Sequence, residues 1–293
     1  MGLFINLETG PSKCPLWLDS TAYTARLLEG GQAPWLDIAS FLSWQRKAQG
    51  LLRADVIALQ AEPVLDALLA THPELRSAMA AKLRALFPLK TLLAATQLRE
   101  QLSEMLGGLR ACFPGIPLAF VVPSPRRWIA LSYRQAFGAD ADVEAGADEF
   151  DSASVYVADF LRCFSESGLD ILLLVEAAHT EPASAEEIEW YRPVLNVATH
   201  YRWELGLRLP LAKADPGMVE GIGFFIAPHP LAAPTGILTP DTFWTGSLPP
   251  ACPTGQFRTA EIPAEANPEL VLDRLAVLHN FGAWIQPVDA IDC

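Results

Sequence analysis

The chain has 293 residues, of which 51% are hydrophobic and 19% are charged, and its formal net charge is −13. This balance predicts a large buried core and excludes an intrinsically disordered chain. An acidic surface repels phosphate backbones and anionic headgroups, so neither nucleic acid nor a membrane surface is an expected partner.

The sequence shows no signal for export or membrane insertion. Its N-terminal residues lack a basic leader followed by a continuous apolar stretch. The apolar run at 171–175 has the length of a strand and is far too short for a membrane span. The five cysteines are widely spaced, and no two of them form a CxxC pair. We therefore expect a cytoplasmic protein with reduced thiols.

The first third of the chain is predicted to be mainly helical. Short apolar strands are expected at 15–19 and 55–59. The clearest helix runs from Leu98 to Phe113, where apolar residues recur at spacings of 3, 4 or 7 before a Pro-Gly pair ends the pattern. The other helices expected in this part lie at 36–52, 63–70 and 75–87.

Strands and helices alternate through the rest of the chain. The acidic segment 140–151 has the character of a solvated loop, and the proline-rich segment 227–254 that of a lid or binding loop. The remaining strands are expected at 117–122, 170–175, 205–209, 222–226 and 257–262. The remaining helices are expected at 126–137, 151–164, 185–199 and 268–280.

This alternation predicts the fold. Helices between short strands that are buried on both faces are typical of parallel βα units. About seven strands can be counted, so we predict an α/β fold of the (β/α)8 TIM-barrel type, with one strand still missed and a helix-rich N-terminal third. Residues 1–293 are expected to form a single domain. No glycine-rich phosphate loop follows any predicted strand, so a nucleotide cofactor is not expected.

Three segments of the chain carry a resemblance by their order and spacing. The first reads LRADVIALQAEPVL from Leu52. The second reads PLAFVVPSP from Pro117, and a helix that ends at Phe137 follows it. The third combines YVADFL from Tyr156 with SGLDILLLVE, which ends at Glu176. Together they resemble the uroporphyrinogen decarboxylase family, which shares its barrel with cobalamin-independent methionine synthase, so the chain is similar to a divergent member of this barrel superfamily.

The barrel geometry selects candidate site residues. In α/β barrels the active site lies at the carboxyl ends of the strands. Glu62 and Glu176 follow predicted strands, and we expect them to handle protons together with His229. A carboxylate directly after five apolar residues, such as Glu176, is expensive to bury unless it finds a cation or keeps a proton. An ion pair with a neighbouring arginine is the structural alternative for Glu176.

Arginine, histidine and aromatic side chains are the expected substrate contacts. Arg126 and Arg127 begin a helix and can bind a carboxylate in two parallel hydrogen bonds. Trp244 in the proline-rich segment is expected to wall an apolar or aromatic substrate. Solvent exposure or core packing is the alternative for each residue. The other expected substrate-binding residues are His179, His200 and Tyr201.

The resemblance implies a function. It favours a lyase, a cofactor-independent decarboxylase that acts on a small organic or aromatic carboxylic acid. The alternatives are a zinc-dependent methyl- or group-transfer enzyme of the methionine synthase branch and a non-catalytic barrel that binds a ligand. No cofactor is expected for the decarboxylase, and no metal ligands are assigned. A homodimer is an assembly that the resemblance implies.

Overall fold

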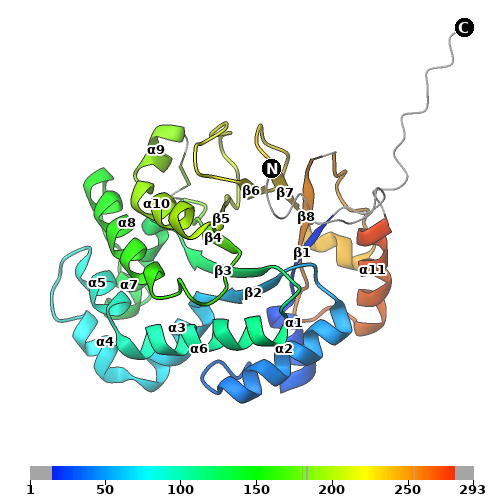
Figure 1. Cartoon of the computed structure of the whole chain (residues 1–293), viewed down its shortest axis with the longest axis horizontal. Coiled ribbons are helices and arrows are strands. Elements are labelled where there is room, and N and C mark those ends of the chain that lie inside the picture. Colours follow the sequence, from blue (N-terminus) through cyan, green and yellow to red (C-terminus); the bar gives the residue numbers. More distant parts are fainter. Residues whose placement is uncertain (1–14, 180, 183, 254, 281–293) are drawn as a thin grey trace, which may run out of the picture.

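The chain folds into a barrel of parallel strands. The computed structural model describes residues 15–179, 181–182, 184–253 and 255–280. In this part, eight parallel strands follow one another in the order β1-β8-β7-β6-β5-β4-β3-β2 and curve into a nearly closed barrel with helices around it (Figure 1). The strands are β1 (Leu16–Asp19), β2 (Ile57–Gln60), β3 (Leu118–Pro123), β4 (Ile171–Val175), β5 (Glu204–Arg208), β6 (Phe224–Ala227), β7 (Thr235–Leu238) and β8 (Phe257–Glu261). The predicted (β/α)8 fold is confirmed.

Helices fill the connections from β1 to β5, and α11 follows β8, whereas the described residues between β5 and β8 contain no α-helix. More than half of the helices precede β3, as the helix-rich first third predicts. They are α1 (Thr21–Glu29), α2 (Ile38–Leu52), α3 (Ala61–Thr71), α4 (Pro73–Met79), α5 (Phe87–Leu93), α6 (Thr96–Cys112), α7 (Pro125–Phe137), α8 (Ala147–Arg162), α9 (Ala185–Glu189), α10 (Arg192–Tyr201) and α11 (Pro268–Asn280), with a 3-10 turn, η1 (Asp241–Thr245), after β7.

Three expected elements differ from the structure. The helix predicted at 75–87 ends at Met79 as α4, and α5 begins only at Phe87, whereas the helix predicted at 185–199 is divided into α9 and α10. Pro193 stands in the first turn of α10, where its missing N–H does no harm but where α9 cannot continue. The segment 227–254 also contains β7, the strand that the sequence count lacked.

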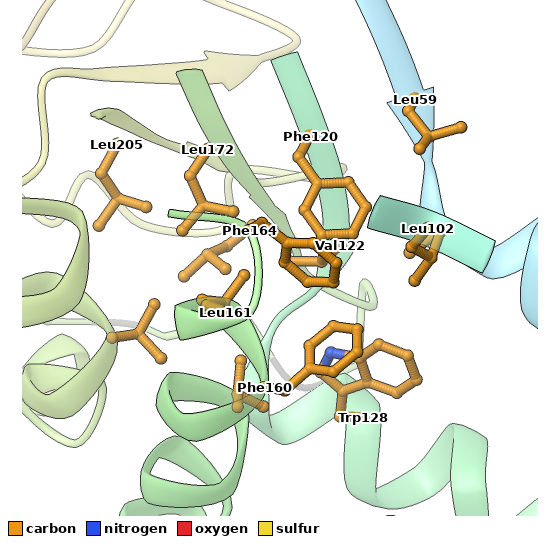
Figure 2. Close-up of a cluster of buried hydrophobic side chains, with 14 of the residues drawn as sticks. Leu59, Leu102, Phe120, Val122, Trp128, Phe160, Leu161, Phe164, Leu172 and Leu205 are labelled. Carbon is orange, nitrogen blue, oxygen red and sulfur yellow. The ribbon is translucent and has the colours of Figure 1, made fainter. Parts of the chain in front are cut away.

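A large core fills the space between the strands and the outer helices. Apolar strand residues such as Phe120 and Leu172 point outward and meet aromatic and aliphatic side chains of α6, α7 and α8 (Figure 2). Phe164 packs edge-on against Phe120 and Phe160, with ring centroids 5.0 Å apart in each pair. This packing fixes the helices on the outside of the barrel.

The opposite face of each strand lines the barrel interior. Because side chains alternate along a strand, every second residue points inward, and these residues form a separate apolar cluster. Phe224 and Phe257, the first residues of β6 and β8, fill the amino end of the barrel, with ring centroids 5.5 Å apart. Gly206 and Gly236 leave room for these two rings. The interior is therefore packed at its amino end around β6 and β8, and space remains towards its carboxyl end and beside β1 and β2.

Side chains bridge a seam between β1 and β2. The hydrogen-bonded strand order starts at one of these strands and ends at the other in the described part of the chain. At the amino end of the seam, Asp55 Oδ2 accepts a hydrogen bond from the Leu16 backbone N–H over 3.0 Å. At the carboxyl end, Gln60 Nε2 donates to Asp19 Oδ2 over 2.5 Å. Hydrogen bonds to the carboxylates of Asp55 and Asp19 thus connect β1 and β2, the two strands at the ends of the hydrogen-bonded order.

One expectation about the cysteines is wrong. Cys252 takes part in a disulfide bond, so the thiols are not all reduced, whereas Cys112 and Cys163 are free. Cys14 and Cys293 lie outside the described residues, as do the N-terminal residues considered for an export signal. None of the described helices combines the length and apolar character needed to cross a bilayer.

Candidate functional site

Two cavities meet at the carboxyl end of the barrel. The larger, of about 890 Å³, lies beside α7 and is called the arginine groove because Arg76, Arg127, Arg134 and Arg208 line it. The smaller, of about 370 Å³, enters the barrel and extends along the β1–β2 seam towards α2, and is called the seam cavity. Both are lined by Glu62, Arg127, Val175 and Arg208. These four residues form the junction between the cavities.

The strand pattern explains which side chains line the seam cavity. Trp17 and Phe257 point into the barrel, so residues two and four positions further along β1 and β8 point inward as well. Asp19, Thr259 and Glu261 are these residues, and all three line the seam cavity. The last inward residues of β1 and β8 are thus carboxylates.

Glu176 is the most deeply buried acid of the site. It follows β4, lines the arginine groove and is 1% exposed. Ser124 Oγ donates a hydrogen bond to its Oε2 over 2.7 Å, and the hydroxyl of Tyr191, which is also buried, donates to its Oε1. Burial raises the pKa of Glu176 to about 7, although both hydrogen bonds and the Arg126 charge act in the opposite direction. Glu176 can therefore carry a proton at neutral pH.

Glu62 and Arg127 form an ion pair at the junction. Arg127 Nη2 lies 2.5 Å from Glu62 Oε2, and both side chains are about a third exposed or less. Glu62 stands in the first turn of α3 and Arg127 in the first turn of α7. The pair fixes the guanidinium at the junction while leaving it in contact with both cavities.

Arg126 has a different surrounding from Arg127. It is 5% exposed and lines neither cavity. Its guanidinium lies 4.8 Å from the centroid of the Phe150 ring and 4.6 Å from that of Trp190. Its Nη2 lies 3.1 Å from Glu187 Oε1. Arg126 thus joins α7 to α8 and to the α9–α10 segment. It lies outside both cavities, so we do not place it at the substrate.

The remaining expected residues are dispersed. His179 lines the arginine groove, whereas His229, after β6, is exposed and lines neither cavity. His200 and Tyr201 end α10 just before β5 begins, which places them at the amino end of the barrel, opposite the site. Trp244 is 5% exposed in a core cluster with α11, and its Nε1 donates to the Glu261 carbonyl over 2.8 Å. It packs the core and walls neither cavity.

Sequence reasoning missed several polar residues of the mouth. Arg208 ends β5 and lies at the junction, with its Nη2 3.7 Å from Glu261 Oε2. Partial burial and the neighbouring Asp19 carboxylate raise the pKa of Glu261. The other missed residues of the seam cavity are Gln60, Thr239, Asp241 and Thr259. The inward alternation continued to the end of each strand finds Gln60, Thr259 and Glu261, whereas Thr239 and Asp241 lie beyond β7, where this signal does not reach.

The described residues contain no group of three or more His, Cys, Asp or Glu side chains arranged to hold a metal ion. We therefore derive no chemical step through zinc. Comparison of the chain with models of known protein families gives no match, and comparison with curated proteins gives none either. The resemblance to the uroporphyrinogen decarboxylase family accordingly stays a prediction from three sequence segments.

Proposed function

We propose that the protein is a lyase, a cofactor-independent decarboxylase of a small organic carboxylic acid. The observation that carries the proposal is Glu176, a buried acid with a pKa of about 7 that lines a groove together with four arginines. Cations bind the acid, and a protonated carboxyl group beside them can replace the lost CO2 with a proton.

The chemical step uses residues of the groove and the junction. The bond between the carboxylate and the α-carbon breaks, CO2 leaves, and the electron pair moves from the α-carbon into a β-carbonyl group or an electron-poor ring of the substrate itself. Arg127 and Arg208 supply two cations at the junction, one to orient the acid and one to stabilise the developing negative charge. Glu176 then gives its proton to the α-carbon, and solvent protonates Glu176 again.

Both aliphatic and aromatic acids stay in the proposal. Trp244, the expected wall for an apolar or aromatic substrate, packs in the core. The Trp17 ring instead lines the seam cavity, together with aliphatic side chains such as Leu173 and Ile226. An acid of either class has to carry its own electron acceptor, because the proposed step uses no cofactor. A cytoplasmic location and a homodimer stay predictions.

The test is CO2 release from a panel of small keto acids and aromatic acids with the purified chain. An active acid should incorporate solvent deuterium at the α-carbon, and Glu176→Gln should lower kcat by about 10²–10⁴, the usual contribution of a positioned proton donor. Glu189→Gln is the matched control, because Glu189 is a half-exposed carboxylate that pairs with Arg192 outside both cavities. A folded Glu176→Gln variant that keeps more than about a tenth of the wild-type kcat contradicts the role of Glu176. Binding of acids without any CO2 release favours the non-catalytic alternative.

A further inference from the structure

We propose that the seam cavity binds a hydroxylated arm of the substrate, so that the substrate is a hydroxylated carboxylic acid. The inference rests on the proposed function for the position of the carboxylate, which binds at the arginines of the junction. It adds which part of the substrate occupies the seam cavity, because decarboxylation alone assigns no role to that cavity.

Two buried threonine hydroxyls carry the inference. Thr239 is 7% exposed and Thr259 is 5% exposed, and both line the seam cavity. The Oγ1 atom of each lies buried without a hydrogen-bond partner among the described residues. Thr259 Oγ1 faces the barrel axis, since it lies 2.6 Å from the point where a Cβ on Gly236 would stand. Buried polar groups are nearly always hydrogen-bonded, so these hydroxyls indicate a polar ligand.

The acids of the same cavity define the chemistry of that ligand. Asp19, Asp241 and Glu261 line the seam cavity but not the arginine groove, and a carboxylate accepts hydrogen bonds without donating any. The threonine hydroxyls need an acceptor for their hydrogen as well as donors. A ligand hydroxyl both donates to a carboxylate and accepts from a threonine, whereas an ammonium group only donates. Hydroxyl groups therefore match the polar part of the lining.

The two cavities also differ in charge in the way that a two-part substrate requires. Arg76 and Arg134 line only the arginine groove, and the three acids line only the seam cavity. An anionic group is attracted to the groove and repelled from the seam cavity. The junction then sets the direction in which the substrate binds, with its acid at Arg127 and Arg208 and its hydroxyl groups towards Thr239 and Thr259. A volume of about 370 Å³ lies at the lower end of the range for small-molecule sites.

Three probes of equal chain length test the inference: gluconate, hexanoate and 6-aminohexanoate, titrated by saturation-transfer NMR into the full chain at pH 7 and low salt. Gluconate should bind at least about tenfold more tightly than hexanoate, because two or more additional hydrogen bonds form. The amino group should give no such gain. Thr259→Val should reduce the preference for gluconate severalfold and leave hexanoate binding unchanged. Thr199→Val, an exposed change near the end of α10, should alter neither.

The outcomes separate this inference from the proposed function. If hexanoate binds, loses affinity in Arg208→Gln, and gluconate binds no more tightly, the hydroxyl subsite is overturned while the carboxylate site stands. Tighter binding of 6-aminohexanoate than of gluconate also overturns it, since the cavity then selects a cation. If none of the three acids binds, the carboxylate site of the proposed function loses its support and the subsite falls with it.

Discussion

Glu176 is expected to make the stability of the protein depend on pH. Its pKa is about 7 in the folded state against an ordinary value of 4.5, so between these values the folded chain binds more protons than the unfolded one. The free energy of unfolding therefore falls as pH rises through this window and is constant above it, with a total loss of at most about 3 kcal/mol. Glu176→Gln keeps the neutral form and should lack this loss.

Urea unfolding at pH 5 and pH 8 measures the effect. The two proteins should have similar stability at pH 5, and the variant should be the more stable at pH 8. Glu189→Gln again serves as the control, because Arg192 lowers the pKa of Glu189 and the pH 5–8 window lies above it. Parallel pH dependence in wild type and Glu176→Gln would show that Glu176 is ionised throughout.

At the residue scale, the sequence predicts the part of the site that follows the strands. Glu62, Arg127 and Glu176 come after strands that are strongly apolar, and the structure places all three at the arginine groove. Asp19 and Arg208 were missed because they lie inside strands, at positions that only the alternation of inward and outward residues distinguishes. Arg126 and Trp244 had the right sequence position but are held by aromatic and core contacts, which a sequence does not show.

At the scale of single elements, the seam between β1 and β2 depends on a few side-chain hydrogen bonds. Asp55→Ala removes the acceptor of the Leu16 N–H group and leaves this buried donor unsatisfied. Such a loss costs about 1–3 kcal/mol of the free energy of unfolding, measurable by urea unfolding. Asp55→Asn keeps a side-chain oxygen and should retain most of the stability. Equal losses in both variants would mean that the charge of Asp55, and not its hydrogen bond, stabilises the seam.

The elements themselves were predicted unevenly, for physical reasons. The helix expected at 268–280 has the bounds of α11, because its apolar residues recur with helical spacing. The strand expected at 170–175 differs from β4 by one residue, because β4 is a continuous apolar run. β7 was missed because it is only four residues long, contains Gly236 and stands among prolines. It forms because it completes the ladder between β6 and β8. Tertiary pairing therefore decides what local propensity does not.

At the scale of the whole molecule, charge is distributed unevenly. The chain has 34 acidic and 21 basic side chains with a net charge of −13, yet four arginines line one groove at the carboxyl end of the barrel. The anionic substrate proposed above would be repelled by most of the surface and attracted to this groove, which would direct its binding to a single face. Composition predicts the acidic surface, but only the closed barrel brings arginines from α4, α7 and β5 to the same place.

Phe224 and Phe257 fill the amino end of the barrel at β6 and β8, and this packing depends on glycine. A Cβ on Gly206 would stand 2.3 Å from the nearest ring atoms of Phe224, so Gly206→Ala should force the ring into its neighbour Phe257. Overpacking of this kind costs about 1–3 kcal/mol, which urea unfolding would measure. Gly107→Ala is the matched control: this glycine lies inside α6 with nothing within 4 Å of a Cβ, so the change should stabilise the protein by about 0.5–1 kcal/mol. If Gly206→Ala were as stable as wild type, the amino end of the barrel would have room for the added methyl group and would not be tightly packed.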